Sequence, residues 1–138
     1  MGTDLKREPG WEARLTQHVI EFMDRRFRWS HADCLAWSCG AVEALTGVDL
    51  MVGLRGYRSE AEGIRFGRKL GYDGLEDLFR KNLEPAPIAM LVDGDIVALE
   101  VDGRISMGVL APPDVLAMMP TGLGTVPISY AVRGYRVP

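Results

Sequence analysis

The amino-acid sequence predicts an α+β domain, with helices in its first part and an antiparallel sheet in its second. Up to Leu83, apolar residues recur at the three- and four-residue spacing of helices. After Pro87 the spacing becomes that of strands, and two apolar segments flank Asp102-Gly103, a dipeptide that suits a tight type I′ hairpin turn. Helices first and an antiparallel sheet second are typical of the α+β class, with a helix buried against one sheet face.

Three of the predicted helices are amphipathic. The first follows Pro9 and extends for about four turns, and its apolar face is formed by Trp11, Leu15, Val19 and Phe22. The next spans 59–70, where Ser59 and Glu62 form a capping box. A short helix over 73–83 follows, and the proline-containing segment after it stops helix formation.

The helix predicted from Cys34 to Leu45 is different because it is apolar on nearly all sides, with Glu43 as its one charged residue. Such a helix must be covered on most of its surface. Asp33 is the predicted N-cap, and Gly47 closes the helix. The most buried helix of the domain therefore begins with a cysteine.

Four strands are predicted in the second part of the chain. The segments 96–101 and 104–110 form the hairpin, and a two-residue turn places Leu99 opposite Ser106. We expect Ser106 to share with Val97 and Leu99 the sheet face that packs on the Cys34 helix. Two shorter strands are expected over 126–130 and 135–137.

Two further segments each permit two interpretations. The apolar segment 115–119, which is bounded by prolines, is either a contact surface or a loop folded into the core. The loop residues Tyr57 and Arg58 either anchor an interface or hold the loop through pairing with Glu60 or Glu62.

Composition excludes several classes of protein. The 138 residues suit one domain, 1–138, and the net charge of -3 argues against a nucleic-acid partner. A membrane-spanning helix needs a run of about 18 apolar residues, and the sequence contains none. The first ten residues are polar, so we do not expect a secretory signal. Cys34 and Cys39 point about 140° apart on one helix, so we expect reduced thiols in a protein made in the cytoplasm.

Cys34 is the candidate nucleophile. A thiol in the first turn of a helix lies near the positive end of the helix dipole, which lowers its pKa and favours the thiolate. The free N–H groups of the same turn can hold an oxyanion during acyl transfer. A buried free cysteine is more often inert packing, however, so the thiol alone does not indicate catalysis.

The order of motifs resembles that of NlpC-type cysteine peptidases, which have a papain-like fold and cut amide bonds in cell-wall peptides. The motifs are the aromatic segment 27–29, Asp33-Cys34 before an apolar helix, and Gly94-Asp95 before a hairpin. More narrowly, Tyr57-Arg58, Gly71 and the C-terminal segment 135–137 resemble small proteins encoded among phage tail genes, whose activity is undefined.

The resemblance implies a role for each matching position. Cys34 is the nucleophile, Asp33 is the acid that precedes it, and Asp95 shapes the first strand of the sheet. The catalytic histidine falls at Ser106, and serine is no base at neutral pH. The orienting polar residue falls near Ala117 or Met118, and neither can fix a tautomer.

Only His31 and His18 remain as candidate bases. His31 lies three residues before Cys34 and stands where the resemblance expects glycine, whereas His18 lies on the first helix at the edge of its apolar face. Packing is the commoner role for a histidine in that place. No cofactor is expected, and the spacing of His31, Asp33 and Cys34 matches no structural zinc pattern.

Three hypotheses about function follow. The first is an accessory or structural protein of a phage-type tail (tail tip or baseplate) on a catalytically degenerate peptidase fold, located in the virion tail and bound to other tail proteins. The second is an active cysteine endopeptidase or amidase that cleaves peptidoglycan peptides, with Cys34 as nucleophile and His31 or His18 as base. The third is a small binding domain in which Cys34 is core packing.

Overall fold

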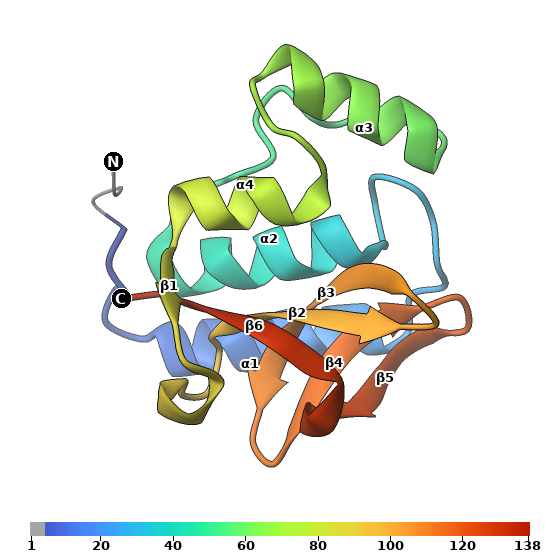
Figure 1. Ribbon diagram of the computed structural model, residues 1–138. Coiled ribbons are helices and arrows are strands. Elements are labelled where there is room, and N and C mark those ends of the chain that lie inside the picture. Colours follow the sequence, from blue (N-terminus) through green and yellow to red (C-terminus); the bar gives the residue numbers. More distant parts are fainter. Residues whose placement is uncertain (1–4) are drawn as a thin grey trace.

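The computed structural model describes residues 5–138, and within this range four α-helices precede all the strands of an antiparallel sheet (Figure 1). This confirms the α+β class. The helices are α1 (Trp11–Met23), α2 (Cys34–Thr46), α3 (Glu60–Lys69) and α4 (Leu75–Asn82). Each lies where the sequence predicts a helix, and most of the observed helix ends fall within one or two residues of the predicted ends.

The end signals of α2 are confirmed, whereas the capping box of α3 is confirmed only in its Ser59 half. The side chain of Asp33 caps α2 by accepting a hydrogen bond from the Ala36 N–H at 2.8 Å, and Gly47 ends this helix in the left-handed conformation. Ser59 caps α3 by accepting from the Glu62 N–H at 3.1 Å, but the Glu62 carboxylate accepts from the backbone of Arg58 rather than from Ser59.

The sheet has six strands in the order β1-β6-β2-β3-β4-β5, and all neighbouring strands are antiparallel. The strands are β1 (Glu84–Ala86), β2 (Ile96–Val101), β3 (Arg104–Ala111), β4 (Asp114–Met119), β5 (Gly122–Pro127) and β6 (Ala131–Arg136). The β2–β3 hairpin pairs Leu99 with Ser106, and both turn residues, Asp102 and Gly103, have positive φ. The predicted register and type I′ turn are therefore confirmed.

Three predictions for the sheet are wrong in detail. The segment 115–119 is neither a surface patch nor a loop, because it forms β4 and buries Val115, Ala117 and Met118. Prolines bound this strand instead of breaking it. The strand predicted over 126–130 ends at Pro127, whose φ of -56° begins a 3₁₀ turn over Ile128–Tyr130. The last strand is β6, which starts at Ala131 rather than at Tyr135.

The face assigned to Val97 and Leu99 is also wrong for these two side chains, although Ser106, which pairs with Leu99, does interact with the thiol of Cys34. These two side chains belong to a second apolar cluster, with Val115 and Val126. The side chains that share the main core with α2 are instead those of Ile96, Ala98, Met107 and Val109. The run Ile96–Leu99 is buried at every position, so the alternation of apolar and polar residues could not choose its helix-facing side.

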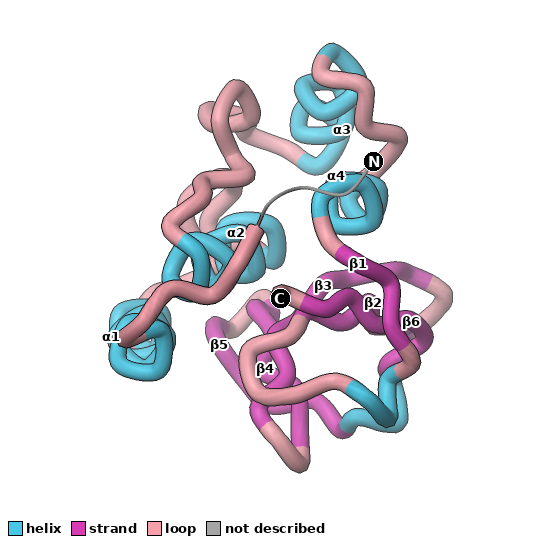
Figure 2. The backbone as a smooth tube through the Cα atoms, turned by 90° about the vertical axis from the view of Figure 1, so that its left-hand side faces the viewer, coloured by secondary structure: helices cyan, strands magenta, loops and turns pink. Residues whose placement is uncertain are grey.

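Figure 2 shows α1, α2 and α4 on one side of the curved sheet, with α3 farthest from it. Helix α2 is the most buried, as predicted, and Trp37, Ala41, Val42 and Leu45 are inaccessible to solvent. Helix α3 has no buried residue. Residue Arg7 lies beside the C-terminus, where its backbone N–H donates to the Pro138 carbonyl at 2.6 Å.

Candidate functional site

Cys34 is the first residue of α2 and is partly exposed. Its thiol lies at the second strand of the hairpin, where it interacts with the side chain of Ser106 and the backbone of Met107. Burial raises the pKa of Cys34, and the Asp33 carboxylate raises it further, while the interactions with Met107 and Ser106 lower it. The net direction is upward, so the expected lowering of this pKa by the helix N-terminus is wrong.

Asp33 is buried and receives three hydrogen bonds from different parts of the chain. Its Oδ1 accepts from the Ala36 N–H, and its Oδ2 accepts from the Ser30 N–H at 2.8 Å and from the Tyr57 hydroxyl at 2.5 Å. The Ser30 hydroxyl in turn accepts from the Gly56 N–H at 2.9 Å. Asp33 thus joins the loop before α2 to the loop after it and fixes the start of the helix.

The burial of Tyr57 and its hydrogen bond to Asp33 could not be predicted from the sequence. Its ring is buried against Phe66 of α3, and its hydroxyl is committed to Asp33. Burial raises the pKa of Tyr57 far above its usual value, and the Asp33 charge adds to this. The buried ring favours the interpretation of Tyr57 as a loop-holding residue over that of an interface anchor.

His18 is a packing residue in the α1–α2 contact. Its ring stacks on Trp37 with centroids 4.7 Å apart and an interplanar angle of 8°, and its Nε2 lies 2.9 Å from the Trp37 carbonyl oxygen. The ring occupies the space above Gly40, where an added Cβ would come within 2.3 Å of it. Burial lowers the pKa of His18. These contacts favour the packing role over that of a base.

His31 is exposed, and its Nδ1 lies 3.1 Å from the Trp29 carbonyl oxygen. In the described part of the chain, neither histidine ring forms a hydrogen bond with Cys34. The positions suggested for the third catalytic residue, Ala117 and Met118, are buried apolar residues of β4. The structure thus brings Ser106 and Asp33 to Cys34 and leaves both histidines in other contacts.

Asp95 links the N-terminal segment at Arg7 to the C-terminal segment at Val137 rather than contributing to the surroundings of the thiol. Its side chain is 1% exposed and forms an ion pair with Arg7 at 2.8 Å. The carboxylate also accepts from the backbone N–H groups of Val92 and Val137, and Arg7 donates to the carbonyl oxygens of Asp93 and Val137. Sequence reasoning missed Arg7 because the partners of its side-chain hydrogen bonds all lie more than 80 residues away.

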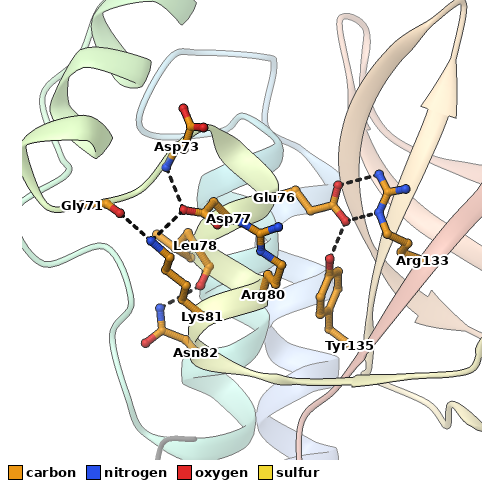
Figure 3. A network of polar contacts seen from close by, with 10 residues as sticks. All are labelled: Gly71, Asp73, Glu76, Asp77, Leu78, Arg80, Lys81, Asn82, Arg133 and Tyr135. Carbon is orange, nitrogen blue, oxygen red and sulfur yellow. Dashed lines mark hydrogen bonds and ion pairs between the residues drawn. The ribbon is translucent and has the colours of Figure 1, made fainter. Parts of the chain in front are cut away.

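A second polar network attaches α4 to the sheet (Figure 3). Glu76 accepts two hydrogen bonds from Arg133, at 2.5 and 2.7 Å, and one from the Tyr135 hydroxyl. Its neighbour Asp77 accepts from the Asp73 backbone N–H at 2.8 Å and pairs with Arg80 and Lys81. The hydrogen bond from Asp73 is the largest of several causes that hold the pKa of Asp77 at about 2.

The structure has a sizeable cavity whose lining does not include Cys34. It has a volume of about 830 Å³ and lies along α1 and α2, where it is lined in part by His18, Gly40, Glu21, Glu43, Arg25 and Arg55. Among residues 5–138, no group of three or more histidine, cysteine, aspartate or glutamate side chains is placed to hold a metal ion. No helix in this range is both long and apolar enough to cross a membrane.

The fold and the site together define an α+β domain whose buried helix begins with a partly exposed cysteine and is capped by a buried aspartate. Residues 6–137 match the model of a family described as a domain of unknown function (DUF6950), and the chain belongs to this family. A search of curated proteins found no match.

Proposed function

We propose that the chain is a non-catalytic accessory protein of a phage-type tail, built on an NlpC-like variant of the papain-like fold. The observation that carries the proposal is the contact between Cys34 and Ser106. In the family that the sequence resembles, this position holds the histidine that deprotonates the nucleophile. The side chain beside the thiol is therefore one that cannot act as its base.

The layout of the domain supports the resemblance. A buried helix begins at the cysteine and packs on an antiparallel sheet, and the residue opposite the thiol comes from the second strand of the hairpin that follows Gly94-Asp95. The chemistry of the thiol supports the loss of catalysis. Burial and the charge of Asp33 raise the pKa of Cys34, so little thiolate forms at neutral pH.

The alternative of an active peptidoglycan amidase or endopeptidase requires an imidazole at Cys34. His18 is stacked between α1 and α2, and His31 is turned to the Trp29 carbonyl. Neither contact supports a thiolate–imidazolium pair. The tail assignment rests on the resemblance of the Tyr57 loop and the C-terminal strand. In this structure both segments are structural, since Tyr57, Tyr135 and Val137 are all buried.

Alkylation of Cys34 by iodoacetamide as a function of pH tests the loss of catalysis. The measurement uses a Cys39→Ala variant, which removes the second thiol. We expect slow alkylation, with a midpoint above the ordinary thiol pKa of about 8.5. Fast alkylation with a midpoint below that value, together with cleavage of peptidoglycan stem peptides that Cys34→Ala abolishes, would show an active enzyme and overturn the proposal.

Ser106→His tests whether position 106 is the seat of the missing histidine. In the Cys39→Ala background, we expect the new imidazole to lower the pKa of Cys34 and to speed alkylation at pH 7 by about tenfold or more, because an adjacent imidazolium favours the thiolate. Arg104→His is the matched control, since it places a histidine at the exposed start of the same strand. Equal effects of the two substitutions would remove the argument from position 106.

The tail assignment needs a separate measurement. Particles purified by density gradient from a bacterium that produces the protein should contain it in a fixed ratio to the tail proteins, as measured by quantitative mass spectrometry. Its presence only in the soluble fraction would refute the tail role and would leave the interpretation of Cys34 intact.

A further inference from the structure

The sheet has two edge strands, β1 and β5, and they differ in how well they are protected against pairing with another strand. Natural sheets block their edges with short strands, prolines and charged residues. Strand β1 has three residues, of which Glu84 is charged and Pro85 has no N–H, and Pro87 follows directly. Strand β5 has six residues, and none of them is charged. Figure 2 shows β1 and β5 on opposite sides of the sheet, so β5 is the edge that stays available for pairing.

The register of the β4–β5 hairpin determines which backbone groups of β5 point away from the sheet. A two-residue turn makes the pair that closes the hairpin, Met119 with Gly122, a hydrogen-bonded pair. Such pairs alternate with non-hydrogen-bonded ones along an antiparallel ladder, so every second residue after Gly122 also bonds to β4. The residues between them present their backbone groups to the outside, and these are Leu123, Thr125 and Pro127. A proline at an outward position is typical of an edge strand, because its missing N–H leaves the ladder intact.

The outward backbone groups of β5 have no partner within the described residues 5–138. The N–H and carbonyl groups that Leu123 and Thr125 present to the outside form no hydrogen bond with another segment of this range, whether with its backbone or with its side chains. Thr125 and Pro127 are exposed, and Leu123 and Gly124 are half-buried. These N–H and carbonyl groups can therefore pair with a strand that is added to the sheet.

The start of β5 lies beside a positively charged segment. The Arg25 carbonyl oxygen is 3.3 Å from the point that a Cβ on Gly122 would occupy, so the chain just after α1 runs past this end of the strand. The segment 24–28 contains three arginines and one aspartate. Arg25 is held over the Phe22 ring, whereas the exposed Arg26 side chain forms no ion pair or hydrogen bond within the described chain. An acidic group brought to this end of β5 would therefore meet a free cation.

The other end of β5 is negatively charged. Asp114 lies opposite Pro127 in the hairpin, and it is the one charged residue among 112–114 and 127–130. Its carboxylate has no hydrogen bond or ion pair in the part of the chain that the structure describes. The six residues of β5 span about 17 Å, so Asp114 does not reach Arg26 of its own chain. The edge thus has a free anion at one end and a free cation at the other.

We propose that two copies of the chain form a dimer by antiparallel pairing of their β5 edges. A two-fold axis near Gly124 places Leu123 of one copy opposite Thr125 of the other, and both residues present outward N–H and carbonyl groups. The same arrangement brings Asp114 of each copy to the end of β5 beside which Arg26 of the other copy lies. Parallel pairing would instead bring ends of like charge together. The contact is small, so the dimer is weak, and it depends neither on the tail role nor on Cys34.

Thr125→Pro tests the edge, because it removes an outward N–H and leaves the hydrogen bonds between β5 and β4 in place. Sedimentation velocity from micromolar to near-millimolar concentration measures the dimer, and the free energy of unfolding in urea verifies the fold. We expect the unmodified chain to dimerise and Thr125→Pro to raise the dissociation constant by about tenfold or more. Thr125→Val is the matched control, since it keeps the N–H and should dimerise like the unmodified chain.

Two outcomes of this experiment would overturn the proposal. An unmodified chain that stays monomeric at every concentration would leave the β5 edge to a protein of different sequence. Equal dimerisation of Thr125→Pro and Thr125→Val would show that the contact between the two copies lies elsewhere on the molecule.

Charge reversal tests the antiparallel orientation and does not require Thr125→Pro to fold. Asp114→Lys and Arg26→Glu each place like charges at both ends of the paired strands, so each variant alone should dimerise more weakly than the unmodified chain. A mixture of the two variants joins a cation to an anion at both ends and should dimerise about as well as the unmodified chain. Val132→Lys is the control, because this exposed residue lies on β6, which three strands separate from β5. A loss that mixing does not reverse would refute the proposed pairing.

Discussion

Asp33 and Cys34 are neighbours at the start of α2, yet their surroundings differ in kind. The carboxylate of Asp33 accepts three hydrogen bonds, from the N–H groups of Ser30 and Ala36 and from the hydroxyl of Tyr57. The thiol of Cys34 is held in its neutral form by burial and by the negative charge of Asp33. The N-cap side chain takes the Ala36 N–H, one of the free donors of the first turn that would favour a thiolate. A helix N-terminus therefore does not by itself activate a cysteine.

Asp95 is a second buried carboxylate that can be compared with Asp33. It is as buried as Asp33, but an arginine neutralises it, whereas Asp33 has only neutral donors. Both carboxylates join segments that are distant in the sequence. The positions at which the resemblance places catalytic groups, Ser106 and Ala117 or Met118, carry no acid or base. In both carboxylates that support the fold, each oxygen accepts at least one hydrogen bond.

Asp95→Asn should give the largest loss of stability. The substitution leaves Arg7 partly buried without its counterion, and breaking such a pair typically costs about 3–5 kcal/mol. The free energy of unfolding in urea measures the loss. Asp93→Asn is the control, because the Asp93 side chain is exposed and only its carbonyl contacts Arg7. A loss below about 1 kcal/mol would show that the ion pair of Arg7 and Asp95 is not an important link between the two ends of the chain.

Asp33→Asn tests separately how Asp33 supports the fold and how it affects the neighbouring thiol of Cys34. We expect a loss of about 2 kcal/mol in the free energy of unfolding, because the amide group must turn an N–H toward Tyr57 or Ser30. The same substitution removes a charge that raises the pKa of Cys34, so alkylation at pH 8 should become faster. Lower stability with unchanged alkylation would mean that Asp33 does not influence the thiol.

Tyr57→Phe removes one of the three donors to Asp33 and keeps the buried ring. We expect a loss of about 1 kcal/mol, since Ser30 and Ala36 still donate to the carboxylate. Tyr130→Phe is the matched control, because that residue is 46% exposed. Equal losses in the two variants would show that the hydroxyl of Tyr57 is not needed to hold the loops together.

The sequence predicts those parts of this structure that depend on neighbouring residues. The helix caps at Asp33 and Ser59 and the hairpin register at Ser106 follow from short-range rules, and the structure confirms them. The sheet face of Val97 was predicted wrongly because β2 is apolar on both sides. Arg7 was missed, since only the folded chain brings it to Asp95. The family resemblance itself stays a prediction.

Asp77 tests whether a third buried carboxylate, whose cationic partners are exposed, behaves like Asp33 and Asp95. Its cationic partners, Arg80 and Lys81, are 60% and 53% exposed, so solvent screens these pairs. Asp77→Asn should therefore reduce stability at pH 7 less than Asp95→Asn does, because the cationic partner of Asp95 is largely buried. The pKa of Asp77 is lowered to about 2 in the folded state, below the ordinary value near 3.9. A lowered folded-state pKa contributes stability that is present above pH 4 and is lost as the pH falls toward 2. The difference in urea midpoint between the parent and the variant should accordingly shrink over this interval and stay constant from pH 5 to pH 8. A difference that persists at pH 2 would assign the role of Asp77 to packing rather than to its charge.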